Sequence, residues 1–259
     1  FVNQALERRP LLSPAAVVAA PAETTGVQYR ALRDAVRSAG ISRIHVVAKS
    51  LAACVGSGVP VDHAPSTLVL DLGAGVTEIA VISAGMVTLA RSLPYGGIDL
   101  DEALRRYLRR RAGIQLTRAA AEDIKLRVGT LDPAQVKQDL NLLDVLPPGA
   151  DTSISPGDLA TVLAEAVEPI VEEVRWILEQ LSPREWGDIE TGGAMLCGGG
   201  ALLRGFAQLL STQLGLRVAV AEDPLGATVL GLSAIAGDVK SLSLDGEHVV
   251  SMGLSSSLY

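Results

Sequence analysis

The sequence predicts an α/β protein that is built partly by duplication. One observation is that the order strand, helix, strand, small-residue helix occurs twice, at about 15–58 and again at 194–236, with little sequence identity. A second is the composition, because a chain of 259 residues with 48% hydrophobic and 20% charged residues can bury a large core. The composition therefore excludes a disordered or fibrous protein.

The first copy starts with the apolar run 15–20, which is typical of a buried strand and ends at Pro21. Thr24 or Thr25 can cap the helix that follows, and Gly40 ends it. The remaining elements of this copy are a helix at 26–39, a strand at 43–47 and a small-residue helix at 50–58. The helix is expected to bury the stripe Val27, Ala31 and Ala35.

The second copy is preceded by strands that the first copy lacks. The predicted preamble consists of strands at 67–71, 78–83 and 86–92, followed by an amphipathic helix at 99–112. Ala84-Gly85 is typical of a hairpin turn, and Asp99 can cap the helix. If the repeat is real, the first copy lacks its own preamble, and Phe1 to Glu7 would be the end of a preceding helix.

An irregular, proline-containing insertion is expected at about 126–157, and a long helix at 158–181 should bend at Pro169. The second copy then consists of a strand at 194–197, a helix at 201–214, a strand at 217–221 and a helix at 224–236. A loose tail is expected from 238 to 259.

Charge and cysteine content narrow the function classes. The net charge of −7 argues against a nucleic-acid binder, so no nucleic-acid partner is expected. Cys54 and Cys197 lie in small apolar surroundings, which indicates buried thiols in a reducing compartment and a cytoplasmic location. The three histidines are scattered, which disfavours a zinc site, and no apolar run reaches the roughly 18 residues of a membrane helix.

The strongest chemical motif is the turn from Asp71 to Glu78, between two predicted strands. Glycine at 73 and 75 lets backbone N–H groups approach a phosphate, because no Cβ intervenes. Asp71 could hold a hydrated Mg²⁺, and Thr77 could bond a phosphate oxygen or a water. A plain hairpin with a solvated Asp is the alternative. The candidate phosphate and Mg²⁺ residues are Asp71, Gly73, Ala74, Gly75, Thr77 and Glu78, with Asp71 acting on the metal through water.

Three weaker motifs could hold the rest of a nucleotide. Gly198-Gly199-Gly200 follows a strand and could lie against a flat base or ribose, or could simply form a tight turn. Glu122 and Lys125 share one helix face and could clamp a ribose, although a surface ion pair is the simpler interpretation. The Gly96-Gly97 turn, with Asp101 nearby, allows a close backbone approach.

In order and spacing, these motifs resemble the actin-like ATPases, most closely the MreB/Mbl family of bacterial cytoskeletal proteins. The resemblance runs from about Ser13 to Ala236. It implies a duplicated ribonuclease-H-like actin fold with one near-complete half and the trailing part of the other. It also implies ATP and Mg²⁺ as cofactors, and ribose or adenine contacts from Gly96, Gly97, Glu122, Lys125, Gly198, Gly199 and Gly200.

The resemblance implies a domain organisation as well. Residues 1–66 would be a partial first domain, 67–221 a second domain with the inserted subdomain at about 126–157, and 222–237 a hinge helix returning to the first. The two small-residue helices would cross closely at Ala52, Ala53, Gly56, Gly226, Ala227 and Gly231.

Two departures from the family pattern put hydrolysis in doubt. The first phosphate loop of the family has no counterpart here, which suggests that the chain is truncated or shortened. Lys49 stands where the first connecting helix of the family has the acid that positions the attacking water, and an ammonium group cannot accept a proton. No catalytic residue is therefore assigned, and the chain is expected to be at most a weak ATPase.

The function that the resemblance implies is a self-associating filament protein for cell shape and wall-synthesis scaffolding, with weak or lost hydrolysis. Membrane-associated wall-synthesis proteins are candidate partners, and a membrane-associated location stays open. The alternatives are a nucleotide-independent scaffold that keeps the fold, or an ATPase or kinase of the same superfold.

Overall fold

The computed structural model describes residues 15–61, 65–136 and 154–239. The strands are β1 (Ala15–Ala20), β2 (Arg43–Ala48), β3 (Thr67–Leu72), β4 (Thr77–Ser83), β5 (Met86–Leu93), β6 (Ala194–Cys197) and β7 (Val218–Val220). The helices are α2 (Gly26–Ser38), α3 (Lys49–Gly56), α4 (Gly97–Ala112), α5 (Arg118–Val128), α6 (Pro156–Ala166), α7 (Glu168–Glu179), α8 (Pro183–Gly192), α9 (Phe206–Leu214) and α10 (Ala227–Val239). Short 3₁₀ helices, η1 and η3, occupy Pro133–Gln135 and Gly199–Leu202.

The described strands form two sheets. One has the order β5-β4-β3-β6-β7. In it, β3, β4 and β5 form an antiparallel meander, β6 pairs in parallel with β3, and β7 pairs in parallel with β6. The other is the parallel pair β1-β2. The parallel pairs β1-β2 and β6-β7 each enclose a helix, α2 and α9, and each is followed by a further helix, α3 and α10. The predicted repeat of elements is therefore confirmed.

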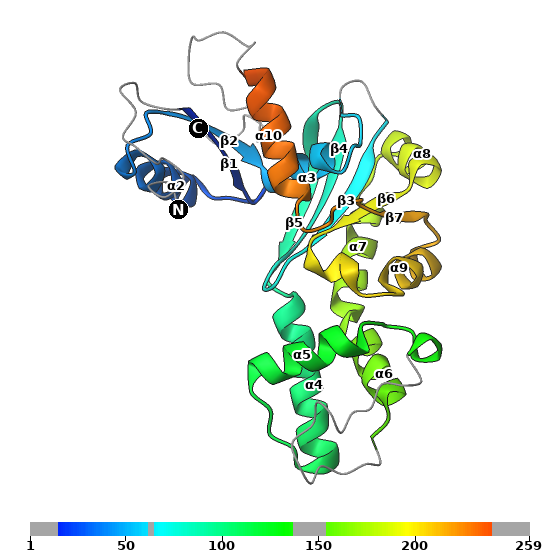
Figure 1. Cartoon of the computed structure of the whole chain (residues 1–259). Coiled ribbons are helices and arrows are strands. Elements are labelled where there is room, and N and C mark those ends of the chain that lie inside the picture. The colour runs from blue at the N-terminus through cyan, green and yellow to red at the C-terminus, as the bar shows by residue number, and fades with distance from the viewer. Residues whose placement is uncertain (1–14, 62–64, 137–153, 240–259) are drawn as a thin grey trace.

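The five-stranded sheet is covered on both faces, and its alternating side chains enter two different cores. In β3, Leu68, Leu70 and Leu72 pack in the larger core, whereas Val69 packs in a smaller one with residues of α3. In Figure 1, α7, α8 and α9 lie beside this sheet on one side, α3 and α10 on the other, and α4, α5 and α6 form a group below it. This alternation decides which side chains of β3 can face α3.

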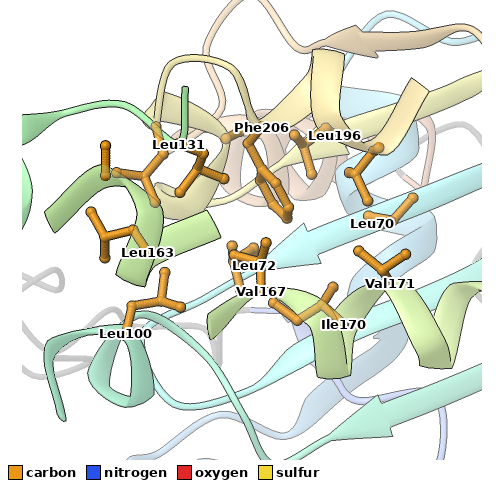
Figure 2. Packing of buried hydrophobic residues seen from close by; sticks show 14 of the residues in the cluster. Leu70, Leu72, Leu100, Leu131, Leu163, Val167, Ile170, Val171, Leu196 and Phe206 are labelled. Carbon is orange, nitrogen blue, oxygen red and sulfur yellow. The ribbon is translucent and has the colours of Figure 1, made fainter. Parts of the chain in front are cut away.

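The larger core extends from the sheet into the group of helices below it. Figure 2 shows Leu70, Leu72 and Leu196 from the strands next to Phe206 of α9 and Ile170 of α7. Each of these five residues is at most 1% exposed. Burial of such side chains stabilises the fold by about 1.5–3 kcal/mol each, so this core holds β3 and β6 rigidly at their carboxyl ends.

Helices α3 and α10 cross in close contact between the two sheets (Figure 1). A Cβ atom placed on Gly56 would lie 1.8 Å from the Ala227 carbonyl oxygen, and one on Gly231 would lie 1.8 Å from that of Ala52. The predicted close approach is confirmed for these residues. Gly226 has a different role, because its Cβ position is filled by the Asp223 side chain.

Several predicted elements were wrong in detail. The helix predicted at 158–181 is two helices that meet at Val167, because Pro169 lies in the first turn of α7 rather than inside a continuous helix. The helix predicted from Ala201 begins at Phe206, after η3 and a left-handed Gly205. Helix α8 was not predicted, and α10 extends to Val239, into the expected tail.

The predicted buried stripe of α2 was also wrong. Val27 is 68% exposed and Ala31 and Ala35 are exposed, whereas Val36 is the buried residue. Thr25 caps this helix as predicted, and its hydroxyl accepts a hydrogen bond from the Gln28 N–H. At α4 the N-cap residue is Gly96, and Asp99 contributes to the cap from the third helical position, where its carboxylate accepts a hydrogen bond of 2.8 Å from the Gly96 N–H. The predictions for residues 1–7, for most of the insertion at 126–157 and for the tail beyond 239 lie outside the described residues.

Candidate functional site: the carboxyl ends of β3 and β6

Asp71 and Glu78 lie opposite each other on the last part of β3 and the first part of β4. Both side chains follow the alternation that sends Val69 and Ala80 toward α3, so both carboxylates face the amino end of that helix. Both residues are buried, with total exposures of 4% and 1%. The sequence predicted them as members of one site, and the strand register places them together.

Lys49, the first residue of α3, forms an ion pair with Asp71. Its Nζ lies 2.8 Å from Asp71 Oδ2, and the Lys49 side chain is 31% exposed while that of Asp71 is 5% exposed. The hydroxyl of Thr228, on α10, donates a longer hydrogen bond of 3.4 Å to the same oxygen. One carboxylate thus joins β3, α3 and α10 at the crossing of the helices.

Glu78 also faces the first copy of the repeat. Its Oε1 accepts a hydrogen bond of 3.1 Å from the backbone N–H of Ser50. Burial raises the pKa of Glu78 above its ordinary value, while contacts with Ser50 and the charge of Lys49 oppose this shift. Desolvation is the largest of these effects, so the protonated form of Glu78 gains relative to the same group in the unfolded chain.

The β3-β4 turn is fixed by the turn that precedes α4. The N–H of Gly97 donates to the Gly73 carbonyl at 3.0 Å, and that of Ile98 donates to the Ala74 carbonyl at 2.7 Å. A Cβ on Gly96 would lie 2.6 Å from the Gly73 oxygen, so glycine is required there for the two turns to meet. Within the first turn, Gly75 is exposed and has open space beside it, with no atom nearer than 3.9 Å to its Cβ position.

Thr77 has an internal partner in this arrangement. Its side chain is fully buried and its hydroxyl donates to the Tyr95 carbonyl at 2.8 Å. The residue therefore joins β4 to the turn before α4. A role for its hydroxyl toward a phosphate or a water stays a prediction.

Lys125 of α5 reaches the same turns from the side. Its Nζ lies 2.7 Å from Asp101 Oδ1 on α4 and donates a hydrogen bond of 3.0 Å to the Gly97 carbonyl. Lys125 and Asp101 are both buried, and burial raises the pKa of Asp101 although Lys125 opposes the shift. Glu122 is exposed one turn earlier on the same helix. Lys125 thus pairs with Asp101, a partner that sequence spacing alone did not select.

The glycines after β6 close the site from the other side. Gly198 has φ +80°, and a Cβ there would lie 2.4 Å from the Leu72 carbonyl oxygen and 2.5 Å from Asp71 Oδ1. A Cβ on Gly200 would meet the Leu72 side chain at 1.9 Å, whereas Gly199 is exposed. Glycine is therefore needed at 198 and 200 for packing against β3, and Gly199 is the member of the three that faces outward.

The structure thus joins the β3-β4 turn, the turn before α4 and Lys125 along a continuous path of hydrogen bonds, and it packs Gly198 and Gly200 against β3. Glu122 and Gly199 are exposed, and their part in the site stays a prediction. Sequence reasoning missed two contributors. Thr228 gave no signal, because a threonine on a helix of small residues is unremarkable. The pairing of Lys49 with Asp71 had a signal, since Lys49 was already the departure from the family pattern, but its partner needed the fold.

Neither a metal cluster nor a thiol pair supplements this site in the part of the chain described. No group of three or more His, Cys, Asp or Glu residues there could hold a metal ion. Cys54 and Cys197 are free and buried as predicted, and burial raises the pKa of the Cys54 thiol to about 12. None of the helices described is both long and apolar enough to cross a membrane.

The meander β5-β4-β3 with β6 and β7 added in parallel, the repeated copy and the two crossing helices together define an actin-like fold. The crystal structure of MreB5 of Spiroplasma citri bound to ADP matches it with a TM-score of 0.78 and 27% identity, over 87% of this chain and 70% of that chain. The same protein bound to AMPPNP matches with a TM-score of 0.80 and 26% identity, over 89% of this chain and 70% of that chain.

The sequence itself gives the family. The model of the MreB/Mbl protein family matches residues 1–244, and the chain belongs to this family. It is 36% identical over 224 residues to the cell shape-determining protein MreB of Escherichia coli (strain K12), over 85% of this chain and 64% of that protein. It is 27% identical to the cell shape-determining protein Mbl of Bacillus subtilis (strain 168), over 93% of this chain and 74% of that protein. The chain thus spans about two thirds to three quarters of the length of these relatives.

Proposed function

We propose that this chain binds an adenine nucleotide against the β3-β4 turn and acts as a filament-forming cell-shape protein. The observation that carries the nucleotide proposal is the hydrogen-bonded meeting of three segments, in which Gly97 contacts both Gly73 and Lys125. Structures of a relative with ADP and with AMPPNP support it. The cell-shape role is supported by the names of the relatives and by family membership.

The geometry divides the predicted contacts into two kinds. The exposed residues Gly75, Glu122 and Gly199 are free to touch a ligand, since their surfaces face outward. Gly96 and Gly198 shape the backbone, because side chains there would strike β3 or its turn. We expect the phosphates at the β3-β4 turn, where backbone N–H groups near glycine can approach anions, and the ribose near Glu122.

Hydrolysis is proposed to be weak or lost, and no catalytic residue is assigned. Lys49 is directly paired with Asp71 and offers no oxygen that could accept a proton from water. The sequence also predicted Mg²⁺ held through water at Asp71. The ion pair does not fit that prediction, because the ammonium occupies the oxygen that faces α3. We therefore propose nucleotide binding without a Mg²⁺ ion at Asp71, whose carboxylate is paired with Lys49.

The alternatives and the partners remain part of the proposal. A nucleotide-independent scaffold would keep the crossing of α3 and α10 without binding ATP, and an enzyme of the same superfold would turn over ATP quickly. Self-association into filaments, a cytoplasmic location and contact with membrane-associated wall-synthesis proteins are proposed from family membership.

The test is a titration of the chain with a fluorescent ADP analogue. Glu122→Ala should weaken binding by about tenfold, because a charge-assisted hydrogen bond is worth about 1.5–3 kcal/mol. Asp123→Ala is the matched control, since Asp123 lies next to Glu122 on α5, is exposed and pairs with Arg127 at 2.9 Å. Equal affinity of both variants and the parent would remove the ribose assignment.

The same samples separate the alternatives. Polymer sedimentation without nucleotide binding would favour the scaffold. Rapid release of phosphate from ATP would favour an enzyme and would contradict the proposal of weak hydrolysis.

A further inference from the structure

The ammonium of Lys49 lies where a cation would be expected to balance Asp71. We propose that Lys49 is a built-in cation of this site: it keeps a divalent metal ion from Asp71, and it lets the chain bind nucleotide phosphates without a metal ion held by the protein. The second part rests on the proposed nucleotide binding, whereas the first part does not.

Two carboxyl groups that face each other favour a cation here. Asp71 and Glu78 are directly opposite each other on β3 and β4, and both are buried. Like charges in directly opposite positions destabilise a sheet. Lys49 forms the ion pair with Asp71 at 2.8 Å and also favours the charged form of Glu78. One side chain thus compensates two neighbouring carboxylates, which is a task that a divalent cation could otherwise perform.

Both oxygens of Asp71 already have close neighbours. Oδ2 is contacted by the Lys49 ammonium at 2.8 Å and by the Thr228 hydroxyl at 3.4 Å. Oδ1 lies 2.5 Å from the position that a Cβ of Gly198 would take, so Gly198 lies close to this oxygen and leaves little room for a further ligand beside it. A hydrated Mg²⁺ keeps several waters and needs near-octahedral space. It would therefore have to displace the ammonium group.

The place of Lys49 in its helix supports the same conclusion. It is the first residue of α3, where the helix dipole is unfavourable for a positive charge, and the preceding Ala48 provides no side-chain cap. The first turn of α3 contains no acidic residue. Attraction to the carboxylates of β3 and β4 is the interaction that offsets this cost, so the lysine is held by the site and not by its own helix.

The ammonium group can donate hydrogen bonds to a phosphate while it stays paired with Asp71. Its side chain is 31% exposed, and an ammonium group has three donors, of which Asp71 Oδ2 takes one. Lysine is a common phosphate ligand in this role of a point charge. ATP without a metal ion should therefore find a positive charge beside the β3-β4 turn.

The first experiment measures Mn²⁺ binding to the whole chain by electron paramagnetic resonance, without nucleotide. In the parent chain Asp71 should bind no Mn²⁺, so the parent chain and Asp71→Asn should show the same Mn²⁺ binding. Lys49→Gln should gain a Mn²⁺ site, and the double variant Lys49→Gln with Asp71→Asn should lose it. Arg175→Gln is the matched control, because it removes the cation of an exposed ion pair with Glu168 on α7 and should gain nothing.

Two outcomes of this experiment would overturn the exclusion of metal. One is Mn²⁺ binding to the parent chain that depends on Asp71, and the other is a folded Lys49→Gln variant that gains no site. If Lys49→Gln does not fold, the nuclear magnetic resonance spectrum of the parent chain with isotope-labelled lysine gives a second readout. The sequence has four lysines, and the signal that disappears in Lys49→Arg is that of Lys49. Selective broadening of that signal by Mn²⁺ would contradict the proposal, and an unaffected signal would support it.

The second experiment measures ATP affinity by calorimetry with Mg²⁺ and with a chelator. The parent affinity should differ by less than about threefold between the two conditions, whereas Lys49→Gln should lose about tenfold or more in the chelator. A loss of about tenfold in the parent on removing Mg²⁺ would refute metal-independent binding. No ATP binding in either condition would instead refute the proposed function, and the Mn²⁺ experiment would still decide the role of Lys49.

Discussion

The first strands of the two copies, β1 and β6, hold the same place in the order of elements but are buried to very different extents. In the second copy, strand β6 lies between β3 and β7, and Leu196 and Cys197 are fully buried. In the first copy, β1 pairs with β2 alone among the described strands, and Ala20 is the one buried residue of β1. The comparison shows that the local pattern sets the type of an element, while its neighbours in the sheet set how much it buries.

The two copies also enter their helices differently. Helix α2 begins with a capping box, in which Thr25 and Gln28 satisfy each other's backbone N–H groups. Helix α9 follows a glycine-rich path through η3 and has no side-chain cap at Gly205. The first arrangement stabilises a helix end, whereas the second brings backbone against β3. This difference explains why, of the two helix entries, the one in the second copy supplies Gly198 and Gly200 to the candidate site.

The largest expected contrast comes from truncating the same side chain in the two copies. Leu210→Ala in α9 should lower the free energy of unfolding by about 2–5 kcal/mol, because Leu210 is fully buried and its loss leaves a cavity. Leu32→Ala in α2 should cost clearly less, since Leu32 is half-buried. Urea unfolding of both variants measures the difference. Equal losses would mean that the first copy is better packed than the described residues indicate.

A smaller effect should come from the crossing that joins the copies. Gly231→Ala should destabilise the chain by about 1–3 kcal/mol, because the new Cβ would lie 1.8 Å from the Ala52 carbonyl oxygen. Gly237→Ala, on the same helix with no atom within 4 Å, is the control and should be neutral or stabilising by up to about 1 kcal/mol. Thermal unfolding of the pair compares them, and a neutral Gly231→Ala would show that the helices can separate at little cost.

The smallest effect should be a pH-dependent one at the start of β3. The backbone N–H and the hydroxyl of Ser66 donate to Asp188 on α8, at 3.0 Å each, and lower the pKa of that carboxyl. A lowered folded pKa gives stability that is present above the unfolded pKa of about 3.9 and is lost as the pH falls through the folded pKa. Asp188→Asn should therefore be less stable than the parent at neutral pH.

The difference between the two chains should shrink when unfolding is repeated at progressively more acidic pH. Ser66→Ala should reproduce the same trend, because it removes one of the two donors. A difference that stays constant with pH would contradict the role of the Asp188 charge.

Much of the fold could be predicted from the sequence because its signals are local. The apolar strand Thr67–Leu72, the Ala84-Gly85 hairpin and the glycine that ends each copy's helix all follow from periodicity and turn chemistry. The buried face of α2 could not be predicted in this way, because it depends on which surface meets the rest of the chain. Val36 is buried and Val27 exposed although both are apolar.

The candidate site, too, could be predicted only in part from the sequence. The alternating glycines after Asp71 and the run Gly198–Gly200 indicated where a ligand could approach. The sequence could not separate glycines that open space, such as Gly75, from those that only avoid a clash, such as Gly198. That distinction depends on the backbone of another strand, which no local pattern contains.

The sequence by itself determined that this is an α/β chain with a repeat, with a glycine turn after a buried acid and with a lysine at the start of α3. The tertiary structure alone decided that this lysine pairs with Asp71 and that Lys125 pairs with Asp101, over separations of 22 and 24 residues in the chain. The physical reason is that strand register and helix crossing set the distances between charges, and a charge selects its partner by distance and burial.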